Sequence, residues 1–301
     1  MRKQMIDYHA DDYGLSVTNS RIMIDCIKNK RLDSISIIPT MDCYEECKKM
    51  LLSEWDSFDS KPLITVHIDL IDGNALSGEE HVLIKDDNGY NISSWGGLFI
   101  ASCIPGKKRD RLKKELREEI LAQMEAVYVG LPDECELRLD SHMHTHMIPV
   151  VRDAMFEAVD SFSEKYNVKP AFVRVAREPI TPFLSKPKLY LTYSPINFVK
   201  NVILNILSPG MERRLRERGI DYGLLWGLIM SGHMDLDRCT VLLDDMTKYA
   251  NKRGRSMEIL YHPGRILTDE VTKAHCKEDV TDFYVSENRD VELEAVNKLE
   301  R

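Results

Sequence analysis

Short apolar runs alternate along the chain with longer amphipathic stretches, and this alternation repeats about seven times. Short runs bounded by turn-forming residues are typical of buried strands. The runs are IDYHA (6–10), SISIIPT (34–40), KPLITVHIDL (61–70), ELRLDSH (136–142), AFVRVA (171–176), DYGLLWG (221–227) and SMEILYHPG (256–264). Between them the apolar positions recur at helical spacing, most clearly over residues 108–130 and from Pro149 to about 164.

Strands that alternate with helices predict right-handed crossovers and a mainly parallel sheet. A chain of 301 residues with about seven such units fits a closed or nearly closed, TIM-barrel-like (β/α) barrel better than an open sheet. No G-x-G-x-x-G follows the first strand and no G-x-x-x-x-G-K-[ST] occurs, so nucleotide binding lacks its usual phosphate loop. We therefore expect one α/β barrel domain over residues 1–301.

Two segments fit the strand–helix repeat poorly. They cover residues 71–107 and about 177–218, and the second contains Pro179, Pro182 and Pro187. We expect both to be insertions over the mouth of the barrel, where substrate specificity usually resides. The alternative is that they only pack against the barrel.

Composition narrows the possible partners and the compartment. A formal charge of -8 and a pI near 5.7 argue against nucleic-acid or anionic-membrane surfaces, which need clustered Lys and Arg. The chain has no apolar run of 18 residues, and its seven scattered cysteines suit reduced thiols. We expect a cytoplasmic protein without nucleic-acid or membrane partners. A homodimer is our expectation for the oligomeric state.

Residues capable of metal and acid–base chemistry gather at the carboxyl ends of the predicted strands. They are Asp11 and Asp12 after the first strand, His67 in the third, Asp140 to His146 at the fourth, Arg174 at the fifth and His262 at the last. Barrel enzymes keep their active sites at this rim. Each residue also has a plainer interpretation: adjacent aspartates favour turns and helix caps, and a lone histidine in an apolar strand usually belongs to the core.

The stretch DSHMHTH carries three histidines at alternate positions. If it stayed extended, one face would carry Asp140, His142, His144 and His146. Alternate side chains stand about 6 to 7 Å apart, so metal–nitrogen bonds of about 2.0 to 2.1 Å cannot reach all of them, and we expect one histidine to be a ligand.

One Asp and two His from three strand ends would leave coordination positions open, as catalytic metal sites do. Such a metal acidifies water and polarises a carbonyl, and a nearby carboxylate can accept the proton. His262 is the available acid for a leaving amine. This chemistry predicts hydrolysis of an amide or ester.

Five motifs occur in order over about residues 5–265 and together resemble the YdjC-like carbohydrate deacetylases, which include chitooligosaccharide deacetylase. The motifs are HADDYGLS, H-x-D-L-x-x-G from His67 to Gly73, D-S-H-x-H-x-H followed by Pro149, R-V-x-x-E from Arg174 to Glu178, and E-I-L-Y-H-P-G from Glu258 to Gly264. The resemblance implies a distorted barrel related to polysaccharide deacetylases. It also implies removal of an acetyl group from an N-acetylated amino sugar or short oligosaccharide.

The resemblance further implies one divalent metal ion, Mg²⁺ or Zn²⁺, with Mn²⁺ or Co²⁺ as other options. Carried over by motif, the roles are Asp12, His67 and His142 as metal ligands, Asp11 as general base, His262 as general acid and Arg174 as the group that keeps the catalytic carboxylate ionised. Asp140, His144 and His146 are then expected to support these residues or to face the substrate.

Two other functions would use the same residues. A non-haem iron(II) oxygenase also binds its metal with two histidines and one carboxylate, although strand–helix alternation disfavours it. A sugar-binding protein that kept the fold without turnover is the second alternative.

Overall fold

The computed structural model describes residues 6–78, 81–275 and 277–301. Within these residues the strands are β1 (Ile6–Tyr13), β2 (Ser34–Ile37), β3 (Leu63–Ile68), β4 (Arg138–Ser141), β5 (Phe172–Val173), β6 (Leu224–Trp226) and β7 (Met257–Tyr261). They form one parallel sheet in the order β5-β4-β3-β2-β1-β7-β6. Each strand lies within one of the seven predicted apolar runs or, for β1, extends beyond it.

The sheet curls until its two edges approach each other. Phe172 in β5 forms a parallel bridge with Asp221, just before β6. The Val173 N–H donates to the Asp221 carbonyl oxygen at 3.0 Å, and the Leu225 N–H donates to the Arg177 carbonyl oxygen at 2.9 Å. These few bonds bring the edges together without a full strand ladder. The expectation of a distorted, TIM-barrel-like α/β barrel is confirmed.

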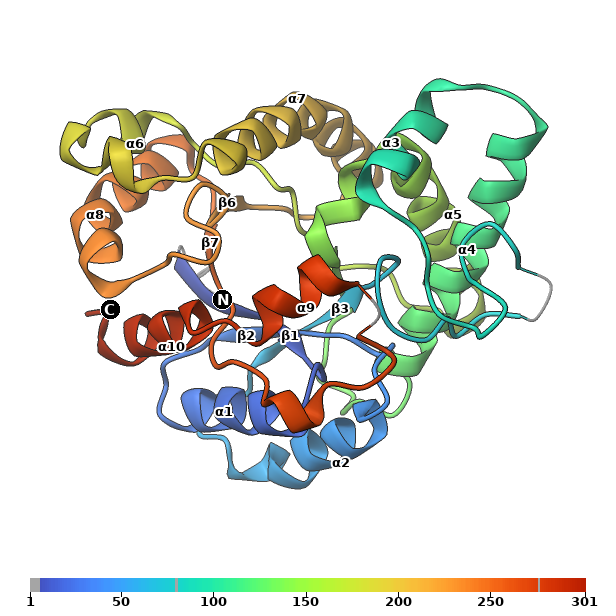
Figure 1. The fold of residues 1–301 in the computed structure, drawn as a ribbon, viewed down its shortest axis with the longest axis horizontal. Coiled ribbons are helices and arrows are strands. Elements are labelled where there is room, and N and C mark those ends of the chain that lie inside the picture. Colours follow the sequence, from blue (N-terminus) through green and yellow to red (C-terminus); the bar gives the residue numbers. More distant parts are fainter. Residues whose placement is uncertain (1–5, 79–80, 276) are drawn as a thin grey trace.

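Helices surround the sheet (Figure 1). They are α1 (Val17–Lys28), α2 (Tyr44–Glu54), α3 (Trp95–Cys103), α4 (Lys107–Tyr128), α5 (Pro149–Tyr166), α6 (Thr181–Leu184), α7 (Pro195–Arg218), α8 (Leu236–Arg253), α9 (Glu278–Tyr284) and α10 (Asn288–Lys298). The local sequence explains where several helices begin. Ser16 and Asp235 cap the N-termini of α1 and α8 through their side chains, and Pro149 is the first residue of α5. No helix among the described residues has both the length and the apolarity to cross a bilayer.

The segment expected to be an insertion at 177–218 is mostly a regular part of the barrel. Its residues 195–218 form α7, which connects β5 with β6 and so takes the place of a crossover helix. Prolines hid this helix, because Pro195 stands in its first turn and Pro209 lies inside it. The other expected insertion, 71–107, holds α3 and irregular chain beside α4 (Figure 1), and its residues 79–80 lie outside the described part.

The chain after β7 returns to the centre of the helix ring. Figure 1 shows α9 there, and both views place it beside β1 and β3. Backbone hydrogen bonds hold this return: the Gly264 N–H donates to the Arg289 carbonyl oxygen at 2.9 Å, and the Ile266 N–H donates to the Tyr284 carbonyl oxygen at 3.0 Å. The sequence patterns did not predict this placement.

Candidate metal and catalytic site

The carboxyl end of β1 is distorted where its two aspartates lie. The register with β2 shifts between Ala10 and Tyr13, and Asp12 has a φ of 72°. Such a left-handed conformation is uncommon outside glycine, and aspartate is among the residues that tolerate it. The two carboxylates consequently have different neighbours: Asp12 lies beside His67 and His142, and Asp11 lies against Arg174.

Asp12, His67 and His142 converge from three strand ends. Asp12 Oδ1 lies 3.6 Å from His67 Nε2 and 3.4 Å from His142 Nδ1. The three ligand atoms lie within 4.8 Å of one another, and the residues are 0%, 1% and 7% exposed. Ligands that bind one tetrahedral ion at about 2.1 Å stand about 3.4 Å apart, so these spacings fit a divalent cation.

Two further observations favour a cation at this cluster. Asp12 Oδ1 is buried and has no hydrogen-bond donor among the described residues. A buried carboxylate oxygen without a partner is costly, and a metal ion would satisfy it. His67 directs Nε2 towards the cluster because its Nδ1 lies 2.6 Å from Asp140 Oδ1, which suits an Nδ1–H donor.

Arg174 is a buried cation that faces three carboxylates. It donates to both oxygens of Asp11 at 2.8 Å and to Glu258 Oε1 at 2.5 Å, and its guanidinium lies 2.8 Å from Asp140 Oδ2. Burial alone would raise the pKa of Asp11, but the charge and hydrogen bonds of Arg174, together with His67 and His9, outweigh burial and hold that pKa well below its usual range. Asp11 is therefore ionised, with Oδ2 lying 3.9 Å from His67 Nε2.

The stretch DSHMHTH does not stay extended. Strand β4 ends at Ser141, and a 3₁₀ segment η2 (His142–Met147) follows, in which Met143 and His144 have φ values of 52° and 55°. The single face of alternating side chains therefore does not form. His142 alone of the three histidines joins the Asp12 cluster.

The two later histidines have different surroundings. Both ring nitrogens of His146 are engaged, Nδ1 with Ser141 Oγ at 2.6 Å and Nε2 with the Arg174 carbonyl oxygen at 2.9 Å, so this residue supports the Arg174 backbone. His144 is partly exposed, and its Nδ1 has no hydrogen-bond partner among the described residues. Burial and the neighbouring Arg174 lower the pKa of His144 well below its usual value, so its ring is neutral.

His262 follows β7 at the same rim. Its backbone N–H donates to Glu292 Oε2 at 2.6 Å, and its Nδ1 lies 3.4 Å from the same oxygen. The ring packs edge-on against Phe283, and its side chain is 13% exposed. Burial opposes it, but Arg289 chiefly, and then His142 and His262, lower the pKa of Asp12. An acid at this position would have the Glu292 carboxylate beside its Nδ1.

Other potential ligand clusters among the described residues fit a metal less well. One joins Asp7, His9 and Glu258, and another joins His9, Asp11 and Asp140. Both depend on His9, whose ring nitrogens are already engaged: Nδ1 lies 2.6 Å from Ser34 Oγ, and Nε2 lies 2.7 Å from Ser36 Oγ. The cluster of Asp12, His67 and His142 is therefore the better candidate for a metal site.

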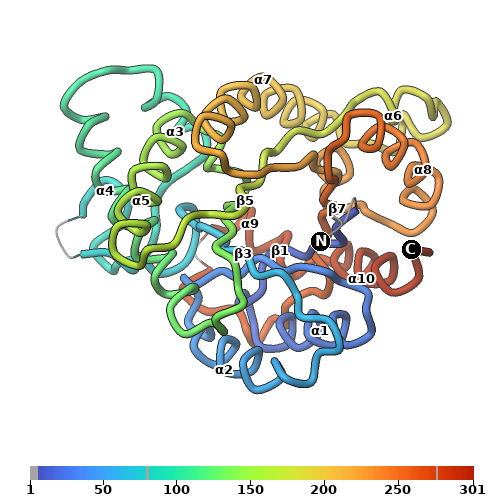
Figure 2. Tube along the Cα trace, turned by 180° about the vertical axis from the view of Figure 1, so that it is seen from behind, coloured from blue at the N-terminus to red at the C-terminus, as the bar shows by residue number. Residues whose placement is uncertain are grey.

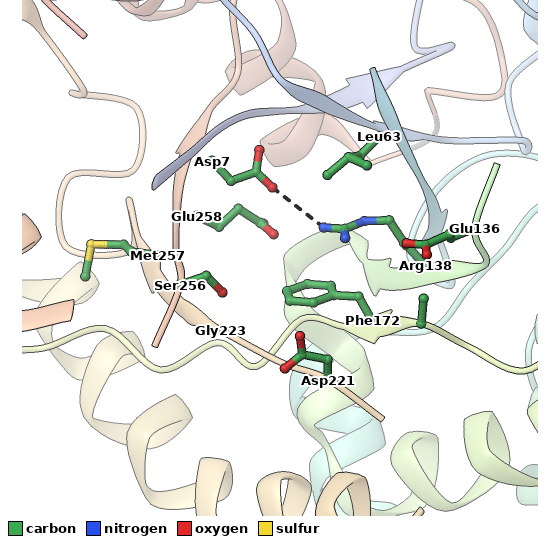
Figure 3. A pocket seen from close by; sticks show the side chains of 11 residues that line it. Asp7, Leu63, Glu136, Arg138, Phe172, Asp221, Gly223, Ser256, Met257 and Glu258 are labelled. Atoms are coloured by element: carbon green, nitrogen blue, oxygen red, sulfur yellow. Dashed lines mark ion pairs between the residues drawn. The ribbon is translucent and has the colours of Figure 1, made fainter. Parts of the chain in front are cut away.

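A cavity of about 220 Å³ lies at the opposite end of the barrel (Figure 3). Its lining residues stand at the amino ends of strands, and Arg138 lies 3.6 Å from Asp7 and over the ring of Phe172. Glu258 lies between this cavity and the candidate site, because it lines the cavity and also accepts a hydrogen bond from Arg174. Sequence reasoning gave no role to His9 or Glu258, although both lie within the five motifs.

Comparison with known proteins is consistent with this arrangement. Residues 8–300 match the sequence model of a family described as "YdjC-like protein". Among solved structures, the chain is similar to a "putative cellobiose-phosphate cleavage protein" from Enterococcus faecalis, with a TM-score of 0.54 and 15% identity over 99% of this chain and 97% of that one. At this identity the likeness concerns the fold. A search of curated proteins returned no match.

Proposed function

The chain belongs to the YdjC-like family, which is related to carbohydrate deacetylases, and on this basis we propose that it is a metal-dependent hydrolase that removes an acetyl group from an N-acetylated amino sugar or short oligosaccharide. The observation that carries the proposal is the convergence of Asp12, His67 and His142 beside the ionised carboxylate of Asp11. A carbohydrate small molecule of the chitooligosaccharide kind is the proposed substrate.

In this proposal Asp12 Oδ1, His67 Nε2 and His142 Nδ1 hold one divalent ion. Two imidazoles and a carboxylate suit Zn²⁺, and Mg²⁺, Mn²⁺ and Co²⁺ are the other candidates. When bound, the ion supplies a Lewis acid that polarises the acetyl carbonyl and acidifies a neighbouring water.

The remaining steps belong to side chains. Asp11 accepts a proton from the attacking water, and Arg174 keeps Asp11 ionised and oriented for this role through its paired hydrogen bonds. His262 donates a proton to the leaving amine nitrogen. Asp140 orients His67, and His144, whose Nδ1 has no hydrogen-bond partner among the described residues, contacts the sugar.

Acetate release tests the proposal. The purified protein, loaded in turn with each candidate metal, is incubated with acetylated chitooligosaccharides, and released acetate is measured beside a His142→Ala control. We expect acetate from the unaltered protein alone. Failure to release acetate from any N-acetyl or O-acetyl sugar would contradict the proposal. Oxygen consumption with iron(II) would favour an oxygenase, and sugar binding without any product would favour a binding protein.

A further inference from the structure

Two buried side chains from the C-terminal segment reach the candidate metal ligands. Tyr284 ends α9 and Arg289 lies in the first turn of α10, and both are 0% exposed. Neither stands at a strand end or within the five motifs. The backbone bonds at Gly264 and Ile266 keep both residues next to the chain that follows β7.

Tyr284 contacts His142 on the side away from Asp12. Its hydroxyl oxygen lies 3.3 Å from His142 Nε2, and the two ring centroids are 6.0 Å apart. A histidine that binds a metal through Nδ1 carries its hydrogen on Nε2, which then donates to a neighbouring acceptor. The Tyr284 hydroxyl is that acceptor, so this contact leaves Nδ1 to face Asp12 Oδ1.

Arg289 holds the other oxygen of Asp12. Its Nη1 donates to Asp12 Oδ2 at 2.8 Å, and its Nε donates to the Gly264 carbonyl oxygen at 3.1 Å. The guanidinium is thus fixed on two sides. With Oδ2 occupied in this way, Oδ1 is the oxygen that remains for a metal ion.

We propose that Tyr284 and Arg289 are positioning residues of the metal site, which select His142 Nδ1 and Asp12 Oδ1 as the ligand atoms. This inference rests on the proposed metal site, although not on the identity of the substrate. Asp140 does the same for His67 from within the sheet, so each of the three ligands has its second polar atom occupied. The C-terminal segment therefore completes a site whose ligands come from earlier strands.

Tyr284→Phe tests the first contact without changing charge. We expect the dissociation constant for Zn²⁺, measured by calorimetry, to rise roughly 10- to 100-fold. We also expect the visible absorption of bound Co²⁺ to change, because one ligand loses its fixed orientation. Tyr249→Phe on α8 is the matched control and should leave both readouts unchanged. Unaltered affinity and spectrum in Tyr284→Phe would overturn the role of Tyr284.

Arg289 is tested with two variants, because losing its positive charge and losing its geometry are expected to change the affinity for the metal in opposite directions. A positioning role predicts weaker metal binding in both Arg289→Lys and Arg289→Gln, roughly 10-fold or more. If only the charge mattered, the Lys variant would bind like the unaltered protein and the Gln variant would bind more tightly, since a cation has left the site. That pattern would overturn the role of Arg289. Arg265→Gln, which removes exposed ion pairs to Glu287 and Asp290, is the control.

Thermal unfolding in the presence of a chelator separates a loss of fold from a loss of orientation. We expect Tyr284→Phe and Arg289→Lys to unfold cooperatively without metal, so they carry the test even if Arg289→Gln fails to fold. Failure of the unaltered protein to bind any divalent ion would contradict the metal site itself. Normal binding by the folded variants would contradict this inference alone, and neither result depends on acetate release.

Discussion

Asp12 adopts a left-handed backbone conformation at the end of β1, beside the register shift with β2. A strained residue of this kind costs about 1 to 3 kcal/mol and persists only where its surroundings hold it. Here Arg289 binds one carboxylate oxygen, and the other oxygen faces two imidazoles. At the scale of single residues, adjacent aspartates thus acquire different neighbours, as the separate roles proposed for them require.

A pair of substitutions tests this separation. His142→Ala is expected to abolish metal binding and turnover, because it deletes a proposed ligand. Asp11→Asn is expected to retain the metal and lose turnover by roughly 10²- to 10⁴-fold, because it removes the proposed base. Calorimetry for the metal and acetate release for turnover separate the two. Loss of metal in Asp11→Asn would reverse the roles assigned to Asp11 and Asp12.

At the scale of elements, Glu178 connects the chain after β5 to two neighbouring segments. Its carboxylate accepts from the backbone N–H groups of Gly227 and Ile229, and from the side chain of Asn201 in α7. This ties α7 to the loop that follows β6. Glu178 is the last residue of the R-V-x-x-E motif, and Arg174 is the first. The motif therefore contributes one residue to the contacts that close the barrel and one to the candidate site.

Glu178 also predicts a pH dependence of stability. Burial raises the pKa of Glu178 to about 7, above an unfolded value of about 4.3. The stabilisation by its neutral form is therefore complete below about 4.3 and is lost as the pH rises through about 7, by at most roughly 4 kcal/mol. Urea unfolding from pH 5 to 8 should show this decline. Glu178→Gln cannot ionise, so an equal decline in that variant would assign the effect to other groups.

For the whole molecule, the candidate ligands join the ends of β1 and β3 to the segment after β4. A metal that binds only the folded chain stabilises it by about 2.7 kcal/mol at a concentration 100 times its dissociation constant. We expect chelation to lower the melting temperature, and added metal to restore it in proportion to the logarithm of its concentration. His142→Ala should melt at one temperature under both conditions. An equal metal response in that variant would place the ion elsewhere.

Much of the barrel could be predicted from the sequence, because each strand carries its own local pattern. The apolar run SISIIPT indicates a buried strand, and the helical spacing of apolar residues over 108–130 indicates an amphipathic helix. Both patterns can be recognised without knowing what lies beside them in the fold. The helix α7 could not be recognised in the same way, since Pro195 and Pro209 resemble breakers until the helix is seen as the connection from β5 to β6. The motif order indicated the family, and the match over residues 8–300 confirms it.

For the candidate site, too, local patterns could be predicted from the sequence and long-range contacts could not. The sequence by itself determined which residues stand at strand ends, because parallel strands place their carboxyl ends on one rim, and so it identified Asp11, Asp12, His67 and His142 as candidates. Only the tertiary structure decided which atoms of these residues are free. That depends on long-range contacts, such as Arg289 with Asp12 and Tyr284 with His142, whose partners are far apart in the chain and carry no local pattern.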